Sequence, residues 1–214
     1  LTDEEEAVYE DAVLAGRYAD ARRVSWNCPD VKNSSKAKRL LELVEEAEED
    51  GRKIIVFSFF LDTIAKVQTL LGDRCMPPIN GSVSPIMRQE IIDEFEKAEP
   101  GAVLAAQIQS GGTGLNIQSA SVVIFCEPQF KPSIENQAVS RAYRMGQTRN
   151  VLVYRLLCEN TVDEKLTEVL EDKQQLFDTF ADSSVAADET FEIDEKSFGD
   201  IMKEEVERIN QKNK

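Results

Sequence analysis

Two arginines in the segment QAVSRAYRMGQ, residues 137–147, are spaced so that they can act together on an anion. Arg141 and Arg144 stand three residues apart near the end of an amphipathic helical pattern. That spacing puts both guanidinium groups on one helix face, where they can bind a multiply charged anion such as a triphosphate. Taken alone, the same pair is also explained as solvated cations favoured by the dipole at a helix C-terminus.

A glycine-rich loop, QIQSGGTGLN at residues 107–116, follows a short buried apolar run. Three glycines in four positions let main-chain amides approach a phosphate or a ribose closely. A tight turn between a strand and a helix is the competing interpretation. The loop matches neither GxGxxG nor GxxxxGK[ST], which excludes a Rossmann fingerprint and a Walker A loop.

A third segment, NGSVSPIMRQEIIDEF at residues 80–95, carries Gly81, Arg88 and Phe95 at intervals of seven. We expect Phe95 to lie in the core and Gly81 to form a turn. Two interpretations stay open for Arg88, which either contacts a neighbouring element or reaches a phosphate.

Short apolar runs alternate with helical patterns along most of the chain. Strands are predicted over residues 53–60, 75–79, 102–106, 121–126 and 151–158. Helices are predicted over residues 3–13, 35–50, 61–72, 84–98, 132–144 and 161–180, with Ser34 or Ser35 as an N-cap and Gly51 and Gly72 as helix ends. The pattern predicts an α/β fold with a doubly wound, mainly parallel sheet of about five strands and helices on both faces.

Such a sheet gathers its functional loops at the carboxyl ends of its strands. Ser58, residues 107–116 and residues 127–131 are therefore expected to line one edge. The paired arginines follow another strand end. We therefore expect them to share one anion site with the glycine-rich loop.

Composition narrows the possible chemistry. The 214 residues include no histidine, and the four cysteines form no CxxC pair. Zinc ribbons, Ser/His/Asp triads and histidine general bases are therefore excluded. No apolar stretch approaches the length of a membrane span and no signal peptide is visible, so we expect a cytoplasmic protein without membrane contact.

Charge is uneven along the chain, which carries 25 basic and 40 acidic residues. Residues 1–50 hold 7 bases and 14 acids, residues 51–158 hold 11 and 9, and residues 159–214 hold 7 and 17. The acidic flanks are typical of solvated helix faces, although they could also hold a basic protein partner. Beyond residue 180, we expect an acidic, weakly structured linker over 181–195 and a marginal helix over 196–214.

The three motifs, in this order, resemble the second RecA-like lobe of superfamily-two helicases, and specifically of bacterial Swi/Snf-type ATPases. KIIVFSFF is similar to helicase motif IV, SGGTGLNIQSASVVIF to motif V and QAVSRAYRMGQ to motif VI. The likeness predicts three parts. Residues 1–34 would be a helical segment joining to a first lobe, residues 35–158 the RecA-like helicase C-terminal lobe, and residues 159–214 an acidic helical extension.

The resemblance also implies roles for individual residues. Arg141 and Arg144 would be arginine fingers that stabilise charge on the γ-phosphate of ATP. The groups expected near the nucleotide or positioning the finger helix are Gly112, Gly114, Asn116, Gln137 and Gln147. The expected nucleic-acid contacts are Ser58, Arg88, Gln109 and Ser110. Gln107, Ile108 and Gln109 stand where relatives often carry a Ser/Thr pair and a basic residue, which weakens the expected phosphate contact.

Neither a Walker A loop nor a Walker B acid after an apolar strand is present. We therefore expect the chain to be inactive alone, as the second motor lobe of a longer ATPase that translocates on double-stranded DNA. ATP and Mg²⁺ would be held mainly by the first lobe, with no metal site in this chain. A bacterial protein acting on DNA would be associated with the nucleoid.

Two alternatives remain at this point. The same motor could act on RNA or on a nucleoprotein complex, because the motifs address the backbone and the nucleotide rather than the bases. The chain could also be a non-catalytic interaction module that keeps the RecA-like fold.

Overall fold

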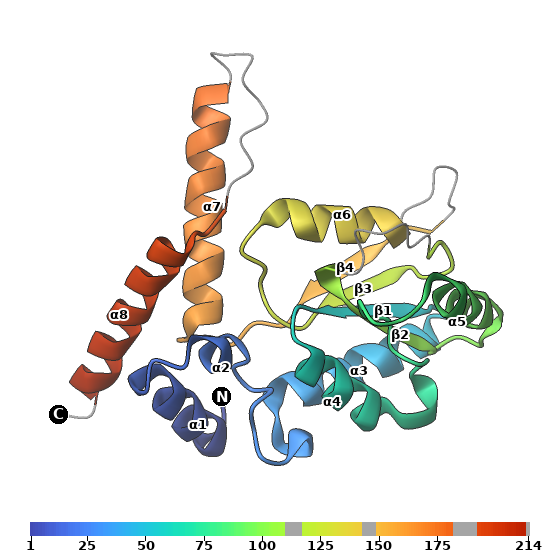
Figure 1. Ribbon diagram of the computed structural model, residues 1–214, viewed down its shortest axis with the longest axis horizontal. Helices are drawn as coiled ribbons and strands as arrows, with labels where there is room; N and C mark the ends of the chain where they lie inside the picture. The colour runs from blue at the N-terminus through green and yellow to red at the C-terminus, as the bar shows by residue number, and fades with distance from the viewer. Residues whose placement is uncertain (110–116, 143–148, 182–191, 213–214) are drawn as a thin grey trace.

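The sheet of this protein is four-stranded and entirely parallel, in the order β2-β1-β3-β4 (Figure 1). The computed structural model describes residues 1–109, 117–142, 149–181 and 192–212, without the side chains of 176–181. The strands are β1 (Ile54–Ser58), β2 (Val103–Gln107), β3 (Val122–Phe125) and β4 (Leu152–Arg155). The longer helices are α1 (Asp3–Leu14), α3 (Ser35–Glu49), α4 (Leu61–Leu71), α5 (Pro85–Lys97), α6 (Pro132–Ala142), α7 (Val162–Ala181) and α8 (Glu195–Lys212).

Helices cover both faces of the sheet, as predicted for a doubly wound fold. Successive residues of β1 point to opposite faces, so that Ile54 and Val56 pack with α3 and α4 while Ile55 and Phe57 pack with α5 and α6. All five residues of β1 are buried. Burial on both faces explains why the strands read as continuous apolar runs in the sequence.

The helix ends follow the predicted local signals. The Ser34 side chain caps α3 by accepting a hydrogen bond from the Ala37 amide, at 3.1 Å. Gly72 ends α4 with a φ of +54°, a conformation that side chains rarely adopt. Ser84 caps α5, and Pro85 occupies its first turn.

The prediction of a strand over residues 75–79 is wrong, because these residues do not form a continuous strand. This segment forms two isolated parallel bridges with β2, from Cys75 to Val103 and from Ile79 to Ala106. Pro77 and Pro78 lie between the bridges, and neither has an N–H to donate to a ladder. The sheet therefore has four strands among the described residues, with this segment along the outer side of β2.

The two ends of the chain pack together as a helical body. It consists of α1, the short helix α2 (Tyr18–Arg22), α7 and α8, which lie side by side in Figure 1. The last helix, expected to be marginal, is 18 residues long and buries Phe198, Ile201 and Ile209 against this body. The expected linker is also partly packed, since Ile193 is buried and its amide donates to the Phe130 carbonyl at 2.9 Å. Residues 182–191 of that linker lie outside the described residues.

The Tyr9 hydroxyl joins three helices of this body. It donates to the Glu205 carboxylate on α8 at 2.8 Å and accepts from the Val162 amide, at the start of α7, at 2.9 Å. Glu205 is also paired with Arg208, at 2.9 Å. Within the described parts of the chain, no helix is long and apolar enough to cross a membrane.

Replacing Tyr9 with phenylalanine is expected to destabilise the chain by about 1–3 kcal/mol, because the buried Val162 amide and Glu205 each lose a partner. Urea denaturation monitored by circular dichroism measures the difference. Tyr154→Phe is the matched control, since the half-buried Tyr154 hydroxyl forms no hydrogen bond with the described residues. Equal stability of the two variants would contradict the prediction.

Candidate functional site

The carboxyl ends of β1 and β3 are joined by a buried carboxylate, and this places Ser58. The Ser58 hydroxyl donates to Glu127 Oε2 at 2.9 Å and accepts from the Phe60 amide at 3.0 Å. Ser58 and Glu127 are both fully buried. The Ser58 hydroxyl faces the interior, where it cannot contact a nucleic acid, so the nucleic-acid contacts proposed below do not include Ser58.

Three other predicted residues have described positions away from this carboxylate. Gln109 is exposed just beyond β2, and Gln137 is exposed on α6. Arg88 is half-buried in the first turn of α5, where one guanidinium nitrogen donates to the Val83 carbonyl at 3.4 Å. The other predicted site residues lie outside the described residues: Ser110, Gly112, Gly114, Asn116, Arg144 and Gln147.

Arg141 lies beside the end of the glycine-rich segment. The amide of Ile117, the first described residue after that segment, donates to the Arg141 carbonyl at 3.1 Å. The Arg141 side chain is half-buried, and its buried Nε has no hydrogen-bond partner among the described residues. The two predicted motifs therefore meet through this pair of residues.

The sequence predicts that the arginines and the glycine-rich loop meet at the carboxyl ends of the strands, but Arg141 and Ile117 meet elsewhere. The helix α6 starts beside the carboxyl end of β3 and runs back across the sheet, so that Arg141 lies at its far end (Figure 1). A helix that crosses over between parallel strands must run antiparallel to them. Arg141 and Ile117 therefore meet over the face of the sheet that α6 covers, and not at the carboxyl ends of the strands.

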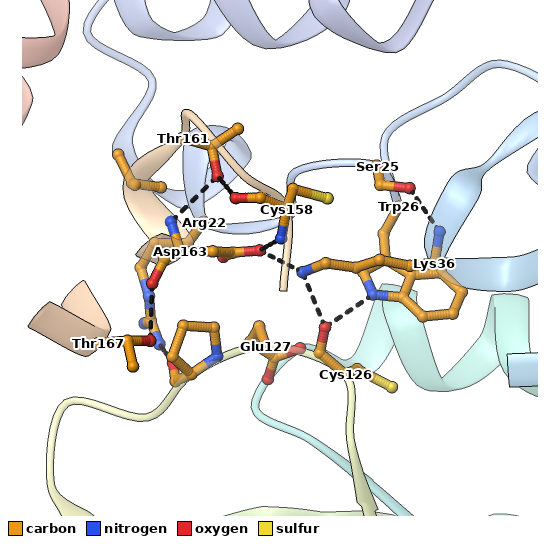
Figure 2. Close-up of polar contacts among 12 residues, drawn as sticks. Arg22, Ser25, Trp26, Lys36, Cys126, Glu127, Cys158, Thr161, Asp163 and Thr167 are labelled. Atoms are coloured by element: carbon orange, nitrogen blue, oxygen red, sulfur yellow. Dashed lines mark hydrogen bonds and ion pairs between the residues drawn. The ribbon is translucent and has the colours of Figure 1, made fainter. Parts of the chain in front are cut away.

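A buried ion pair lies beside the carboxyl end of β3 (Figure 2). The Lys36 ammonium is 2.6 Å from Asp163 Oδ2 and donates to the Cys126 carbonyl at 3.0 Å. The indole of Trp26 donates to the same carbonyl, also at 3.0 Å. Asp163 in turn accepts from the Cys158 amide at 3.1 Å. Lys36 and Asp163 are 2% and 0% exposed, so both charges are removed from water.

Arg22 adds a second buried cation. Its guanidinium lies 4.0 Å from the ring centre of Phe130 and 5.2 Å from those of Phe59 and Phe60. One of its nitrogens donates to the Pro128 carbonyl at 3.4 Å. The aromatic faces stabilise this cation where water cannot reach it.

Glu5 connects α1 to the start of α3. Its carboxylate accepts from the hydroxyl and the amide of Ser35, both at 2.6 Å, and from the Ser25 hydroxyl at 2.5 Å. It also accepts from the Thr2 amide, which completes a capping box at the start of α1.

The pKa values of these groups reflect burial and hydrogen bonding. Burial raises the pKa of the Glu127 carboxyl, although the Phe59 amide and the Ser58 hydroxyl act in the opposite direction. For Lys36, burial alone would lower the pKa, but the neighbouring carboxylates, Asp163 first, raise it above its ordinary value. Burial also acts to raise the pKa of Glu5, but its hydrogen bonds from Ser25, Ser35 and Thr2 outweigh this and lower it to about 2.

Sequence reasoning missed the roles of Arg22, Lys36 and Asp163. A signal was available for Lys36, because it shares the apolar face of α3 with Leu40, Leu43 and Val44. A charge on the apolar face of a helix predicts a buried partner. Arg22 gave no such signal, because its aromatic neighbours come from distant segments.

Metal binding was not expected in this chain. Within the described ranges, no group of three or more His, Cys, Asp or Glu side chains is arranged to hold a metal ion.

Comparison with known proteins identifies the family. The model of the helicase conserved C-terminal domain matches residues 35–146. An uncharacterized ATP-dependent helicase of Mycoplasma pneumoniae is 37% identical over 148 residues, which are 68% of this chain and 14% of that protein. The ATP-dependent helicase fft2 of Schizosaccharomyces pombe is 33% identical over 184 residues, which are 84% of this chain and 14% of that protein.

Solved structures agree with the sequence match. The Sulfolobus solfataricus SWI2/SNF2 ATPase core in complex with dsDNA superimposes with a TM-score of 0.67 and 28% identity, covering 84% of this chain and 44% of that one. The chain therefore belongs to the helicase C-terminal domain family, as a RecA-like second lobe of the Swi2/Snf2 type. It spans about one seventh of the length of the two relatives described above.

Replacing Glu5 with glutamine is expected to destabilise the chain at pH 7 by about 3 kcal/mol, the equivalent of a pKa lowered from 4.5 to about 2. Because the pKa is lower in the folded state, this stabilisation is complete above the unfolded value of 4.5 and is lost as the pH falls toward 2. The stability difference between the variant and the wild type should therefore shrink between pH 5 and pH 2. Denaturation curves across this range measure it.

The control is Asp3→Asn, because Asp3 is an exposed acid in the same first turn. It should change stability by less than about 1 kcal/mol. A Glu5→Gln variant with a pH-independent stability difference would show that the Glu5 carboxylate does not have this role.

Proposed function

We propose that this chain is the second motor lobe of a DNA-dependent ATPase that translocates on double-stranded DNA. The main structural support for this proposal is the hydrogen bond between Arg141 and Ile117, which joins the arginine motif to the end of the glycine-rich segment. Two relatives are named ATP-dependent helicases, and the Sulfolobus structure is of a complex with dsDNA. These names support the choice of ATP as substrate and of duplex DNA as the track.

In this proposal, the first lobe holds most of the ATP and the Mg²⁺. Closure of the two lobes brings Arg141 and Arg144 to the γ-phosphate, where their charge stabilises the transferring phosphoryl group. Gly112, Gly114 and Asn116 approach the nucleotide, and Gln137 and Gln147 position the finger helix.

The nucleic-acid contacts in this proposal are Arg88, Gln109 and Ser110. Arg88 is half-buried on α5, and Gln109 is exposed just beyond the end of β2. Cycles of closure and opening would then move the two lobes along one strand of the duplex. Without a Walker A loop, the isolated chain would not hydrolyse ATP.

Replacing Arg144 with alanine in the full-length protein that carries the ATP-binding lobe should lower kcat by about 10³-fold or more. Arg141→Ala should act in the same direction. ATPase rates are measured without nucleic acid and with duplex DNA, single-stranded DNA and RNA. The wild type should be stimulated most by duplex DNA.

The control is Arg39→Ala, which removes an exposed arginine of α3 and should leave kcat unchanged. Thermal melting establishes that each variant is folded. Turnover close to wild type for folded Arg144→Ala would contradict the finger assignment. Stimulation by RNA alone would move the track to RNA, and no response to nucleic acid would favour an interaction module.

A further inference from the structure

The Lys36–Asp163 pair is not explained by stability alone. Removing two charges from water is costly, and an apolar pair of similar volume often stabilises a protein as well or better. The pair is also not fully satisfied within the described parts of the chain, since Asp163 Oδ1 is buried there without a hydrogen-bond partner. Buried ionic groups with incomplete partners call for a reason other than folding.

From Lys36, contacts continue to the ends of the two central strands and of β2. The Cys126 carbonyl that binds Lys36 directly precedes Glu127. Glu127 then accepts from the Phe59 amide, at 2.6 Å, and the Phe59 carbonyl accepts from the Gln107 side chain, at 3.2 Å. The chain of contacts ends at the first residue of the glycine-rich segment.

A second branch leads to the helix that carries Arg141. The Gln129 side chain donates to the Glu127 carboxylate at 3.1 Å, and the Gln129 amide donates to Glu135 at 3.3 Å. Glu135 is buried in α6 and is paired with Arg155, at the end of β4, at 2.5 Å. The start of α6 is therefore fixed by the same turn that Lys36 holds.

On its other side, Lys36 is bound to the helical body. Asp163 lies in the first turn of α7, where the Thr161 hydroxyl accepts from its amide at 3.2 Å. Tyr9 binds the neighbouring amide of Val162, so α1 and α8 are tied to the same turn. Figure 2 shows the Lys36 ammonium pointing between Asp163 and the Cys126 carbonyl.

We propose that Lys36 and Asp163 are positioning residues for ATP hydrolysis, which couple the helical body to the finger helix and to the glycine-rich segment. This inference rests on the motor function proposed above. Neither residue touches the nucleotide. The pair sets the position of the turn after β3, and through it the start of α6 and the placement of Arg141.

The test uses the double variant Lys36→Met/Asp163→Asn in the full-length protein. Both charges are removed together, the asparagine can still accept from the Cys158 amide, and Trp26 still donates to the Cys126 carbonyl. The Lys36→Met variant alone leaves a buried unpaired carboxylate and should lower Tm by roughly 10 °C. The double variant should recover most of that loss.

Positioning predicts that the folded double variant loses at least about tenfold in kcat with duplex DNA, because small displacements of a catalytic group cost large factors in rate. Its KM for ATP should stay within about twofold, because the first lobe holds the nucleotide. The control Lys38→Met removes an exposed lysine of the same helix and should change neither kcat nor Tm. A double variant with wild-type Tm and wild-type kcat would overturn the inference.

The Arg144→Ala variant separates this inference from the proposed function. If Arg144→Ala abolishes turnover while the folded double variant keeps wild-type kcat, the positioning role fails and the motor function stands. If Arg144→Ala also turns over normally, the proposed function itself fails. A double variant in which KM rises and kcat is unchanged would show a nucleotide-binding effect, and this too would overturn the positioning role.

Discussion

The ammonium of Lys36 lies where the parts of the chain meet. It holds α7 through Asp163 and the turn after β3 through the Cys126 carbonyl, while Trp26 brings the N-terminal segment to that same carbonyl. A buried charge is strongly destabilising when its opposite charge is missing. The sheet, the N-terminal segment and α7 must therefore be assembled together, and the sequence around each of them is constrained by this one group.

The sheet and its covering helices were predictable because their signals are local. Short apolar runs mark β1 to β4, of which β1 to β3 are buried. Ser34, Gly72 and Ser84 mark helix ends whose physical causes act within a few residues. The strand predicted over residues 75–79 is absent because Pro77 and Pro78 have no N–H groups to donate, although the segment is apolar. The stability of α8 was underestimated, because the surface that buries Phe198 and Ile201 comes from the opposite end of the chain.

The site was predictable in part. The spacing of the arginine motif and of the glycine-rich loop predicts that they act together, and the structure adds one backbone hydrogen bond, from the Ile117 amide to the Arg141 carbonyl. The contact between Arg141 and Ile117 lies over one face of the sheet because α6 runs back across it, a direction that the expectation of a site at the strand ends left out. The burial of Ser58 was hidden for another reason, since its partner Glu127 is 69 residues away and no local pattern pairs them.

The packing of α1 against α8 has a mechanical consequence. Lys212, near the end of α8, is within 2.7 Å of Glu6 and 3.0 Å of Glu10 on α1, and Glu5 on the same helix is bonded to the start of α3. Tension applied along α1 is thus shared between two anchors, one on α3 and one on α8. A displacement of α1 therefore moves α3 and α8 together, whereas attachment to only one of them would leave the other in place.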